Sequence, residues 1–217
     1  MIVVIDGPAG AGKSSTAKAV ARKSGFNYID TGAMYRGFTA LFLKCHKNST
    51  LFFEEITKER VQFEFEKDVS NVFLDGENIT DEIRTSRIND NVSEVAAMSP
   101  VRAEVLVFLK RIVDEGKEAY IAEGRDLGTV VFPYADLKIF LTADIDIRAK
   151  RRLSEMSEKD VNVDKVKENL LSRDEKDSTR QEAPLLKADD AIELDTTNLS
   201  FDEQVDVILD KINKLLK

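Results

Sequence analysis

The sequence contains very few residues that bind metals or form covalent cross-links. Among its 217 residues, cysteine and histidine occur once each, at Cys45 and His46. A single cysteine excludes an intramolecular disulfide, and one cysteine beside one histidine argues against a metal centre built on thiolate and imidazole ligands. This cysteine usage fits the reduced environment of the cytoplasm.

Long apolar runs are also missing. The first run covers only residues 2–5; a membrane-spanning helix needs roughly 18 apolar residues, and a signal peptide would have a basic leader before its apolar run. The formal net charge is −8 and the isoelectric point is about 4.9, so the chain as a whole repels nucleic-acid backbones. We therefore predict a cytoplasmic protein that has neither a membrane nor a nucleic acid as its partner.

The composition that remains is typical of one globular domain, with 42% hydrophobic and 33% charged residues. Short apolar runs at residues 2–5, 26–29, 119–122, 137–141 and 191–194 are typical of buried parallel strands. Helical spacing occurs at residues 13–23, 144–156 and 163–180, and Ser200 with Glu203 forms a capping box before a last helix. The pattern predicts a three-layer α/β fold with a central parallel sheet.

The pattern changes between residues 51 and 98. Val61, Phe63 and Phe65 alternate with polar residues, and Asp75-Gly76 is a hairpin-type pair, so we expect a small antiparallel β subdomain inserted into the α/β framework. Residues 81–98 are expected to be helical, and Pro100 to begin the helix that runs to Gly116. We predict one domain, residues 1–217, with its core at about 1–45, 99–143 and 181–217. An insert covers about 46–98, and two further helices with the segment between them cover about 144–180.

Residues 7–14 match the pattern G-x-x-x-x-G-K-[ST] after a buried strand and at the start of a helix, which is the context of a phosphate-binding P-loop. Glycines let backbone N–H groups turn toward phosphate oxygens, and the helix N-terminus adds positive potential. Lys13 brings a charge to the β- and γ-phosphates, and the Ser14 hydroxyl can hold Mg²⁺. The predicted ATP-binding residues of this loop are Gly7, Pro8, Ala9, Gly10, Ala11, Gly12, Lys13, Ser14 and Ser15.

Arginines are placed where a second anionic ligand would need them. Arg36 and Arg125 follow predicted strands, at the sheet edge where α/β proteins bind ligands. Arg148, Arg151 and Arg152 share one face of a helix, and Arg173, Asp177 and Arg180 share one face of the next. Solvated ion pairs would explain the helical arginines equally well. Arginine binds phosphate oxygens in pairs, so the pattern favours a phosphotransferase with a site for several anions.

Taken together, these residues resemble the bacterial cytidylate kinase family, the CMP/dCMP kinases of the nucleoside monophosphate kinase group. The resemblance covers nearly the whole chain in order. It rests on IDGPAGAGKSS, DTGAMYR, EIRT, SEVAAMSPVR, EGRDLGTVVFP, KIFLTA, RAKRR and SRDEKDSTRQEAPL. It implies a P-loop kinase fold that transfers phosphate from ATP, with Mg²⁺, to CMP or dCMP. In such a fold the insert at about 46–98 would bind the acceptor, and residues at about 144–180 would form the lid and its flanking helices. It also implies a monomer whose partners are these nucleotides.

The resemblance implies a role for each matching residue. Arg36, Arg125 and Arg180 would hold the acceptor phosphate, and Ser93, Arg102 and Asp126 would face the cytosine. Arg173 and Asp177 would reach the ribose, Thr31 would lie beside the acceptor phosphate or base, and Arg148, Arg151 and Arg152 would form the lid. Lys13, Arg125, Arg151 and Arg180 would carry catalysis, with Arg148 and Arg152 on ATP. Many family members have Ser in place of Thr31 and Asp in place of Glu123. Glu123 could support Mg²⁺ through a water molecule.

Two other readings explain part of the pattern, and a third fits it poorly. The acceptor could instead be UMP or a shikimate-like compound, because the P-loop does not identify it. A P-loop regulatory NTPase is the other, but it leaves Arg36, Arg125 and Arg180 without a role. A nucleic-acid-binding ATPase fits poorly with the acidic charge.

Overall fold

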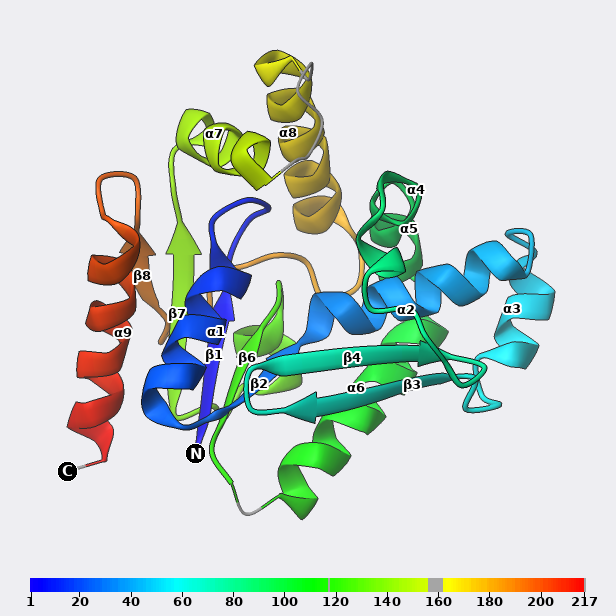
Figure 1. Ribbon diagram of the computed structural model, residues 1–217, viewed down its shortest axis with the longest axis horizontal. Helices are drawn as coiled ribbons and strands as arrows, with labels where there is room; N and C mark the ends of the chain where they lie inside the picture. The colour runs from blue at the N-terminus through cyan, green and yellow to red at the C-terminus, as the bar shows by residue number, and fades with distance from the viewer. Residues whose placement is uncertain (117, 156–161, 217) are drawn as a thin grey trace.

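The central feature of the molecule is a five-stranded parallel sheet in the order β2-β6-β1-β7-β8. The structure is a computed structural model that describes residues 1–116, 118–155 and 162–216. The strands are β1 (Ile2–Asp6), β2 (Asn27–Asp30), β6 (Tyr120–Glu123), β7 (Leu137–Thr142) and β8 (Ile192–Asp195). Figure 1 shows their carboxyl ends pointing to one edge, with the loop after β1 lying beneath two helices, α7 (Ile145–Glu155) and α8 (Val163–Thr179).

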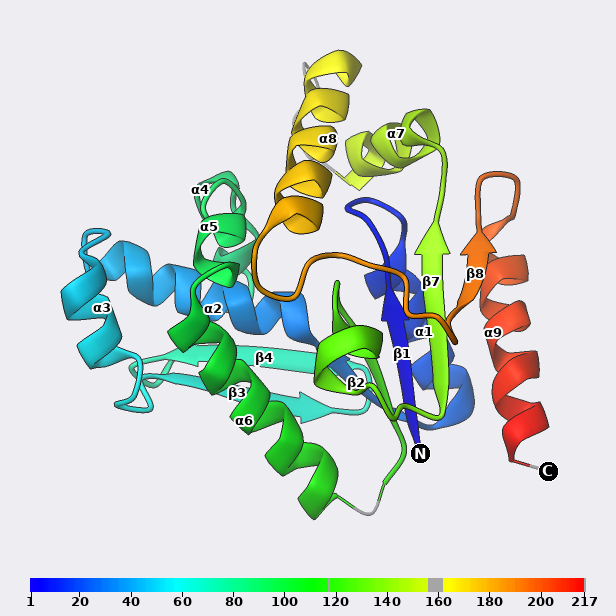
Figure 2. The same ribbon diagram turned by 180° about the vertical axis from the view of Figure 1, so that it is seen from behind.

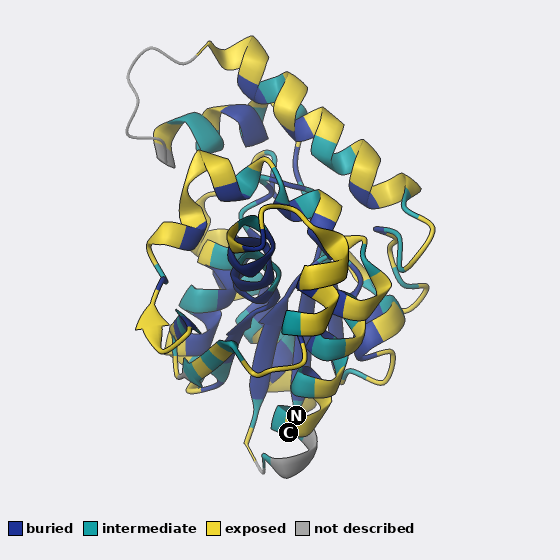
Figure 3. Cartoon of the chain, turned by 90° about the vertical axis from the view of Figure 1, so that its right-hand side faces the viewer, coloured by how far each residue is buried: buried dark blue, intermediate teal, exposed yellow. Residues whose placement is uncertain are grey.

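Helices cover both faces of this sheet. On one face, α1 (Lys13–Ser24) and α9 (Phe201–Leu215) pack against β1, β6 and β7 through apolar side chains such as Val20 and Ile208. On the other face lie α2 (Thr31–Lys44), α6 (Ser99–Glu115) and the π-helical turn η2 (Leu127–Val131). Figure 3 shows the strands in the buried colour between more exposed helices. The predicted three-layer α/β fold is confirmed.

A second, antiparallel sheet lies beside the first and is built from β3 (Val61–Glu66), β4 (Val69–Leu74) and β5 (Glu77–Asn78). Asp75 and Gly76 have φ of 54° and 82°, so the hairpin predicted at this pair is confirmed. The longer β3–β4 hairpin turns at Lys67, whose φ is 48°. The hairpin packs on α2 at Gly37, where a Cβ would lie 2.8 Å from Val72. The predicted antiparallel insert is therefore present.

The predicted continuous helix at residues 81–98 is wrong. The structure has three short pieces there: η1 (Glu82–Arg84), α4 (Ser86–Asn89) and α5 (Val92–Ala96). The side chains of Asn89 and Asn91 donate to the carbonyls of Arg84, at 3.0 Å, and Arg87, at 2.7 Å. Asparagine side chains that bond to nearby backbone compete with helical hydrogen bonds, which explains the breaks. A further helix not predicted from sequence, α3 (Ser49–Glu55), follows α2.

The remaining predicted elements differ from the structure only at their ends. The helix predicted at 144–156 is α7, the helix predicted at 163–180 is α8, and the last strand begins one residue later than predicted. The polar sequence SEMSEKDVNVD at residues 154–164 predicts a mobile segment, and its residues 156–161 lie outside the described residues. Figure 2 shows the segment after α8 crossing the back of the molecule to β8. Within the described ranges, no helix has the length and apolar character needed to cross a membrane.

Candidate active site

The loop between β1 and α1 has the backbone of a phosphate cradle. Gly10 and Gly12 have φ of 74° and 91°, a conformation that favours glycine. Gly7 is required by close approach, because a Cβ there would lie 2.0 Å from the carbonyl oxygen of Leu141 on β7. The Lys13 Nζ donates to the Pro8 carbonyl at 2.7 Å, which folds the side chain back over the loop.

Burial changes the acid–base behaviour of this lysine. Lys13 is 5% exposed. Burial, and secondly the positive charge of Arg125, lowers the pKa of Lys13 to about 7. Binding of a triphosphate would oppose both effects, because phosphate charge favours the ammonium form. The positive charges of Lys13 and Arg125 lie close together at this loop, so a highly anionic ligand would bind there favourably.

Carboxylates end two neighbouring strands next to the cradle. Asp30 and Glu123 are register partners at the ends of β2 and β6. The Ser14 hydroxyl donates to Glu123 Oε1 at 2.7 Å, and the Thr31 hydroxyl donates to the Glu123 carbonyl at 2.7 Å. Burial, and secondly the charge of Asp30, raises the pKa of Glu123. Asp30 is buried too, but the charges of Arg36 and Arg84 hold its pKa below the usual value. These oxygens are hard donors of the kind that Mg²⁺ prefers.

A third carboxylate, Asp6 at the end of β1, fixes the start of η2. Its two oxygens accept from the backbone N–H groups of Leu127, at 3.0 Å, and Gly128, at 2.7 Å. Asp6 is 4% exposed. The two bonds hold the turn that carries Arg125 and Asp126.

Asp6 makes the stability of the protein depend on pH. Burial, with a smaller contribution from the charge of Asp126, raises the pKa of Asp6 from 3.8 to about 6. Between these pH values the folded state keeps a proton that the unfolded state has released, so linkage makes stability fall as pH rises. We expect the free energy of unfolding of wild type, relative to Asp6→Asn, to fall by about 3 kcal/mol between roughly pH 4 and pH 7. Urea unfolding of both proteins at four pH values measures this difference; a constant difference would contradict it.

A cleft of about 330 Å³ opens beside the P-loop and runs toward α5 and the end of α8. It brings together predicted residues from the loop, namely Ala9, Gly10, Gly12, Lys13, Ser14 and Ser15, and from the rest of the chain, namely Thr31, Arg36, Ser93, Arg125, Asp126, Arg152, Arg173, Asp177 and Arg180. These residues come from segments far apart in sequence. The convergence of Arg36, Arg125 and Arg180 predicted from sequence is therefore present.

The arginines in the cleft are oriented by carboxylates. Arg125 Nε donates to Asp177 Oδ2 at 2.9 Å, and Asp177 is 6% exposed. Arg173 has a buried Nε that lacks a hydrogen-bond partner. Burial, followed by the charges of Arg125 and Arg36, lowers the pKa of Arg173 to about 10. Arg173 thus lies close enough to Arg36 and Arg125 for their charges to oppose its own, which is an arrangement that a phosphate group would stabilise.

Asp126, which also lines the cleft, lies between two arginines. Its Oδ1 accepts from Arg180 Nη2 at 3.0 Å, and its Oδ2 accepts from Arg102. Asp126 is 4% exposed. Arg102 also lies over the ring of Tyr35, at 5.8 Å from the ring centroid. A carboxylate flanked by guanidinium groups offers the acceptor and donor pair that a cytosine edge requires.

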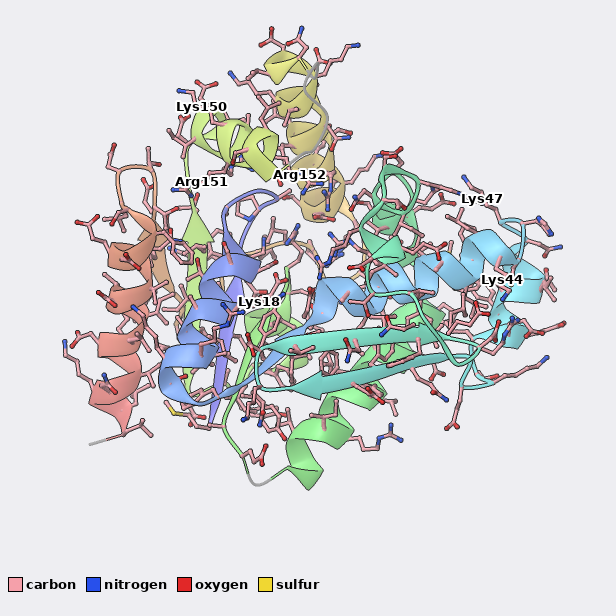
Figure 4. All side chains as sticks on the ribbon, viewed as in Figure 1. Lys18, Lys44, Lys47, Lys150, Arg151 and Arg152 are labelled. Atoms are coloured by element: carbon pink, nitrogen blue, oxygen red, sulfur yellow. The ribbon has the colours of Figure 1, made fainter. Side chains whose placement is uncertain are left out.

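Some predicted residues do not line the cleft: Gly7, Pro8, Ala11, Arg102, Arg148 and Arg151. Arg151 donates to the Thr196 hydroxyl and carbonyl, both at 2.9 Å. Figure 4 shows Arg151 and Arg152 on α7, with Arg152 on the side toward α8. Arg148 is 7% exposed, and its guanidinium group is hydrogen-bonded to other residues of the protein. The lid prediction placed Arg148 on the cleft, whereas in the structure it does not line the cleft. Its helical spacing with Arg152 gave no sign that the two side chains differ in burial.

Sequence reasoning missed several residues of the site, three of which have polar side chains. Arg84, from η1, lines the cleft and donates to Asp30 Oδ2 at 3.2 Å. Tyr35 lines the cleft next to Arg36. Asp30 interacts with the charges of Arg84 and Arg36, and it caps α2 by accepting from the Ala33 N–H at 2.8 Å. The signal for Arg84 was present in the segment EIRT. It was overlooked because that segment was expected to be ordinary helix.

Comparisons with known proteins point to one family. The model of the cytidylate kinase family matches residues 3–214. A cytidylate kinase of Fusobacterium nucleatum is 46% identical over 217 residues, covering 99% of this chain and 98% of the relative. A cytidylate kinase of Clostridioides difficile is 44% identical, covering 98% of each chain.

Solved structures share the fold at low identity. An uncharacterized protein from Eubacterium ventriosum has a TM-score of 0.54 and 13% identity, with 98% of each chain covered. The protein TT1252 from Thermus thermophilus has a TM-score of 0.50 and 16% identity, with 100% of this chain and 98% of that chain covered. At these identities the likeness concerns the fold alone.

Proposed function

Because the chain belongs to the cytidylate kinase family, we infer that it transfers the γ-phosphoryl group of ATP to CMP or dCMP, giving ADP and CDP or dCDP. The observation that carries this inference is the single cleft that joins the P-loop to Arg36, Arg125, Arg173 and Arg180. A kinase with a phosphorylated acceptor must hold two anionic nucleotides close together, and this cleft combines a triphosphate cradle with a second cluster of cations.

The donor side of the cleft is proposed to work by positioning and charge. The N–H groups of the P-loop and the Lys13 ammonium hold the β- and γ-phosphates of ATP, and Arg152 lines the same cleft from α7. Ser14 and Glu123 would hold Mg²⁺, which supplies charge neutralisation between the phosphates. Their paired oxygens beside the cradle support this assignment.

The acceptor side is proposed to fix the phosphate, the ribose and the base of CMP separately. Arg36, Arg125 and Arg180 hold the phosphate in line with the γ-phosphate, so that no covalent enzyme intermediate is needed. Arg173 and Asp177 reach the ribose. Thr31 lies beside the acceptor phosphate or base. Ser93, Arg102 and Asp126 read the cytosine, and the carboxylate of Asp126 accepts from its exocyclic amine.

The cellular setting is part of the same proposal. Nucleotides are small, soluble substrates, and the chain has a single, buried cysteine. We place the enzyme in the cytoplasm as a monomer, with its core, insert and lid at the boundaries given above. The insert would bind CMP, and the lid would close over ATP.

A substrate panel tests this function. We expect ADP release, measured in a coupled assay at fixed ATP and Mg²⁺, to be fastest with CMP or dCMP, slower with UMP, and near background with AMP or shikimate. A preference for UMP would show that the base assignment is wrong. Equal ATP turnover without any acceptor would instead favour the regulatory NTPase.

A further inference from the structure

Arg148, predicted from sequence as an ATP-binding arginine, is bonded instead to the P-loop itself. Its Nη1 donates to the Ala9 carbonyl at 2.9 Å, and its Nε donates to the Ala143 carbonyl at 3.1 Å. The same Nη1 also pairs with Asp174 Oδ2. A guanidinium that is 7% exposed and bonded in this way has a structural position.

The second member of this arrangement is Asp174 on α8. Its Oδ1 accepts from the Ala9 N–H at 2.8 Å, while Oδ2 pairs with Arg148. The side chain of Asp174 is 17% exposed. Arg148 and Asp174 therefore bind both peptide groups that flank Ala9, one through its N–H and the other through its C=O.

Apolar packing supports the same contact. Ala9 is 2% exposed and belongs to a small core of its own with Ala149, Val166 and Leu170, against which Ile145 and Leu153 also pack. These partners come from α7 and α8. The tip of the P-loop is thus inserted between the two helices, and a change in their position would move the loop.

One peptide unit connects this contact to the reacting end of the site. The Pro8 carbonyl accepts from Lys13 Nζ at 2.7 Å, and the N–H of the same peptide unit, that of Ala9, donates to Asp174. On α8, Asp174 directly follows Arg173, which lines the cleft together with Asp177. Asp174 therefore joins the loop that carries the donor phosphates to the helix that carries acceptor-site residues.

We propose that Arg148 and Asp174 act as positioning residues: they form a clasp, consisting of these two side chains and the Ala9 peptide groups, that sets the shape of the phosphate cradle without touching ATP. The proposal rests on the proposed function, since it assigns ATP to the P-loop. It also replaces the predicted role of Arg148 as a lid arginine that contacts the triphosphate.

A double-mutant cycle tests the clasp in the full-length protein. We expect Asp174→Ala and Arg148→Met each to raise the Kd of ATP, measured by calorimetry without acceptor, by about 10- to 100-fold, as for loss of a charged hydrogen bond. The Kd of the double variant for ATP should not exceed the higher of the two single-variant Kd values, because both substitutions remove the same contact. Glu175→Ala, an exposed change on the same helix, serves as the matched control and should bind ATP as wild type does.

Two outcomes would overturn the proposal. If the two effects multiply in the double variant, Arg148 contacts ATP independently of Asp174. If the variants lower Tm but keep the wild-type Kd for ATP, the clasp stabilises the fold only. Asp174→Asn retains an acceptor for the Ala9 N–H, so it provides a test if Asp174→Ala does not fold. Asp174→Asn should raise the Kd of ATP less than Asp174→Ala does. The calorimetry measures ATP binding without an acceptor. If the wild-type protein did not phosphorylate CMP, the proposed function would be refuted, but the test of the clasp by ATP binding would still apply.

Discussion

Replacing Lys13 with Met should lower kcat for CMP phosphorylation by about 10³-fold or more, since the loss of one group that stabilises developing charge costs rates of this order. Lys13 is the cation of the P-loop, and its Nζ lies on the Pro8 carbonyl, at the cradle. Steady-state kinetics with saturating ATP and CMP measures the effect. Its transition-state role predicts a larger change in kcat than in the KM for CMP.

The matched control for this variant is Lys23→Met on the same helix, since the Lys23 side chain is 48% exposed and pairs with Asp206 outside the cleft. Its kcat should stay within about twofold of wild type. We also expect Lys13→Met to be at least as stable to urea as wild type, because burial and the charge of Arg125 disfavour the ammonium form of Lys13 in the folded protein. A Lys13→Met enzyme with wild-type kcat would refute the assigned role of the P-loop.

The second large effect concerns the choice of base. Asp126→Asn should reduce the ratio of kcat/KM for CMP to kcat/KM for UMP by about 100-fold or more, since sites built to hydrogen-bond a substrate discriminate strongly. A carboxylate accepts from the cytosine amine and repels the uracil carbonyl, whereas an amide can present its NH₂ group to uracil. The KM for ATP should change little, because the Asp126 carboxylate bonds to Arg102 and Arg180, which come from outside the P-loop.

The control for this variant is Asp202→Asn, an exposed acidic residue in the first turn of α9. It should leave the CMP-to-UMP ratio unchanged. Loss of activity on both pyrimidine nucleotides without a change in their ratio would mean that Asp126 only orients Arg102 and Arg180. Base selection would then have to come from another residue.

The sequence predicted the sheet and the P-loop because both depend on local patterns. A β-branched run followed by glycines, lysine and serine specifies a buried strand and a cradle within a few residues. The sites of Arg36 and Arg125 were predictable for a related reason, since side chains that follow parallel strands meet at one edge. The base-reading trio of Ser93, Arg102 and Asp126 came from the family resemblance and remains a prediction.

The parts that could not be predicted depend on tertiary contacts. Arg148 and Arg152 share a helix face in sequence, but only the packing of Ala9 between α7 and α8 makes the first buried and leaves the second on the cleft. The break of the expected helix at 81–98 depends on asparagine side chains that bond backward to carbonyls. Because that break was not predicted, Arg84 was interpreted as part of an ordinary helix.

The pairing of β1 has a consequence for how the protein is made. Both neighbours of this first strand arrive late in the chain, since Ile2 pairs with Tyr120 and Val3 with Leu137. A ribosome adding about 5–20 residues per second leaves β1 without partners for on the order of ten seconds. During that interval its apolar side chains and unpaired backbone groups are exposed to chaperones and to aggregation, so nascent-chain survival should be more sensitive to changes in β6 and β7 than to changes in β8.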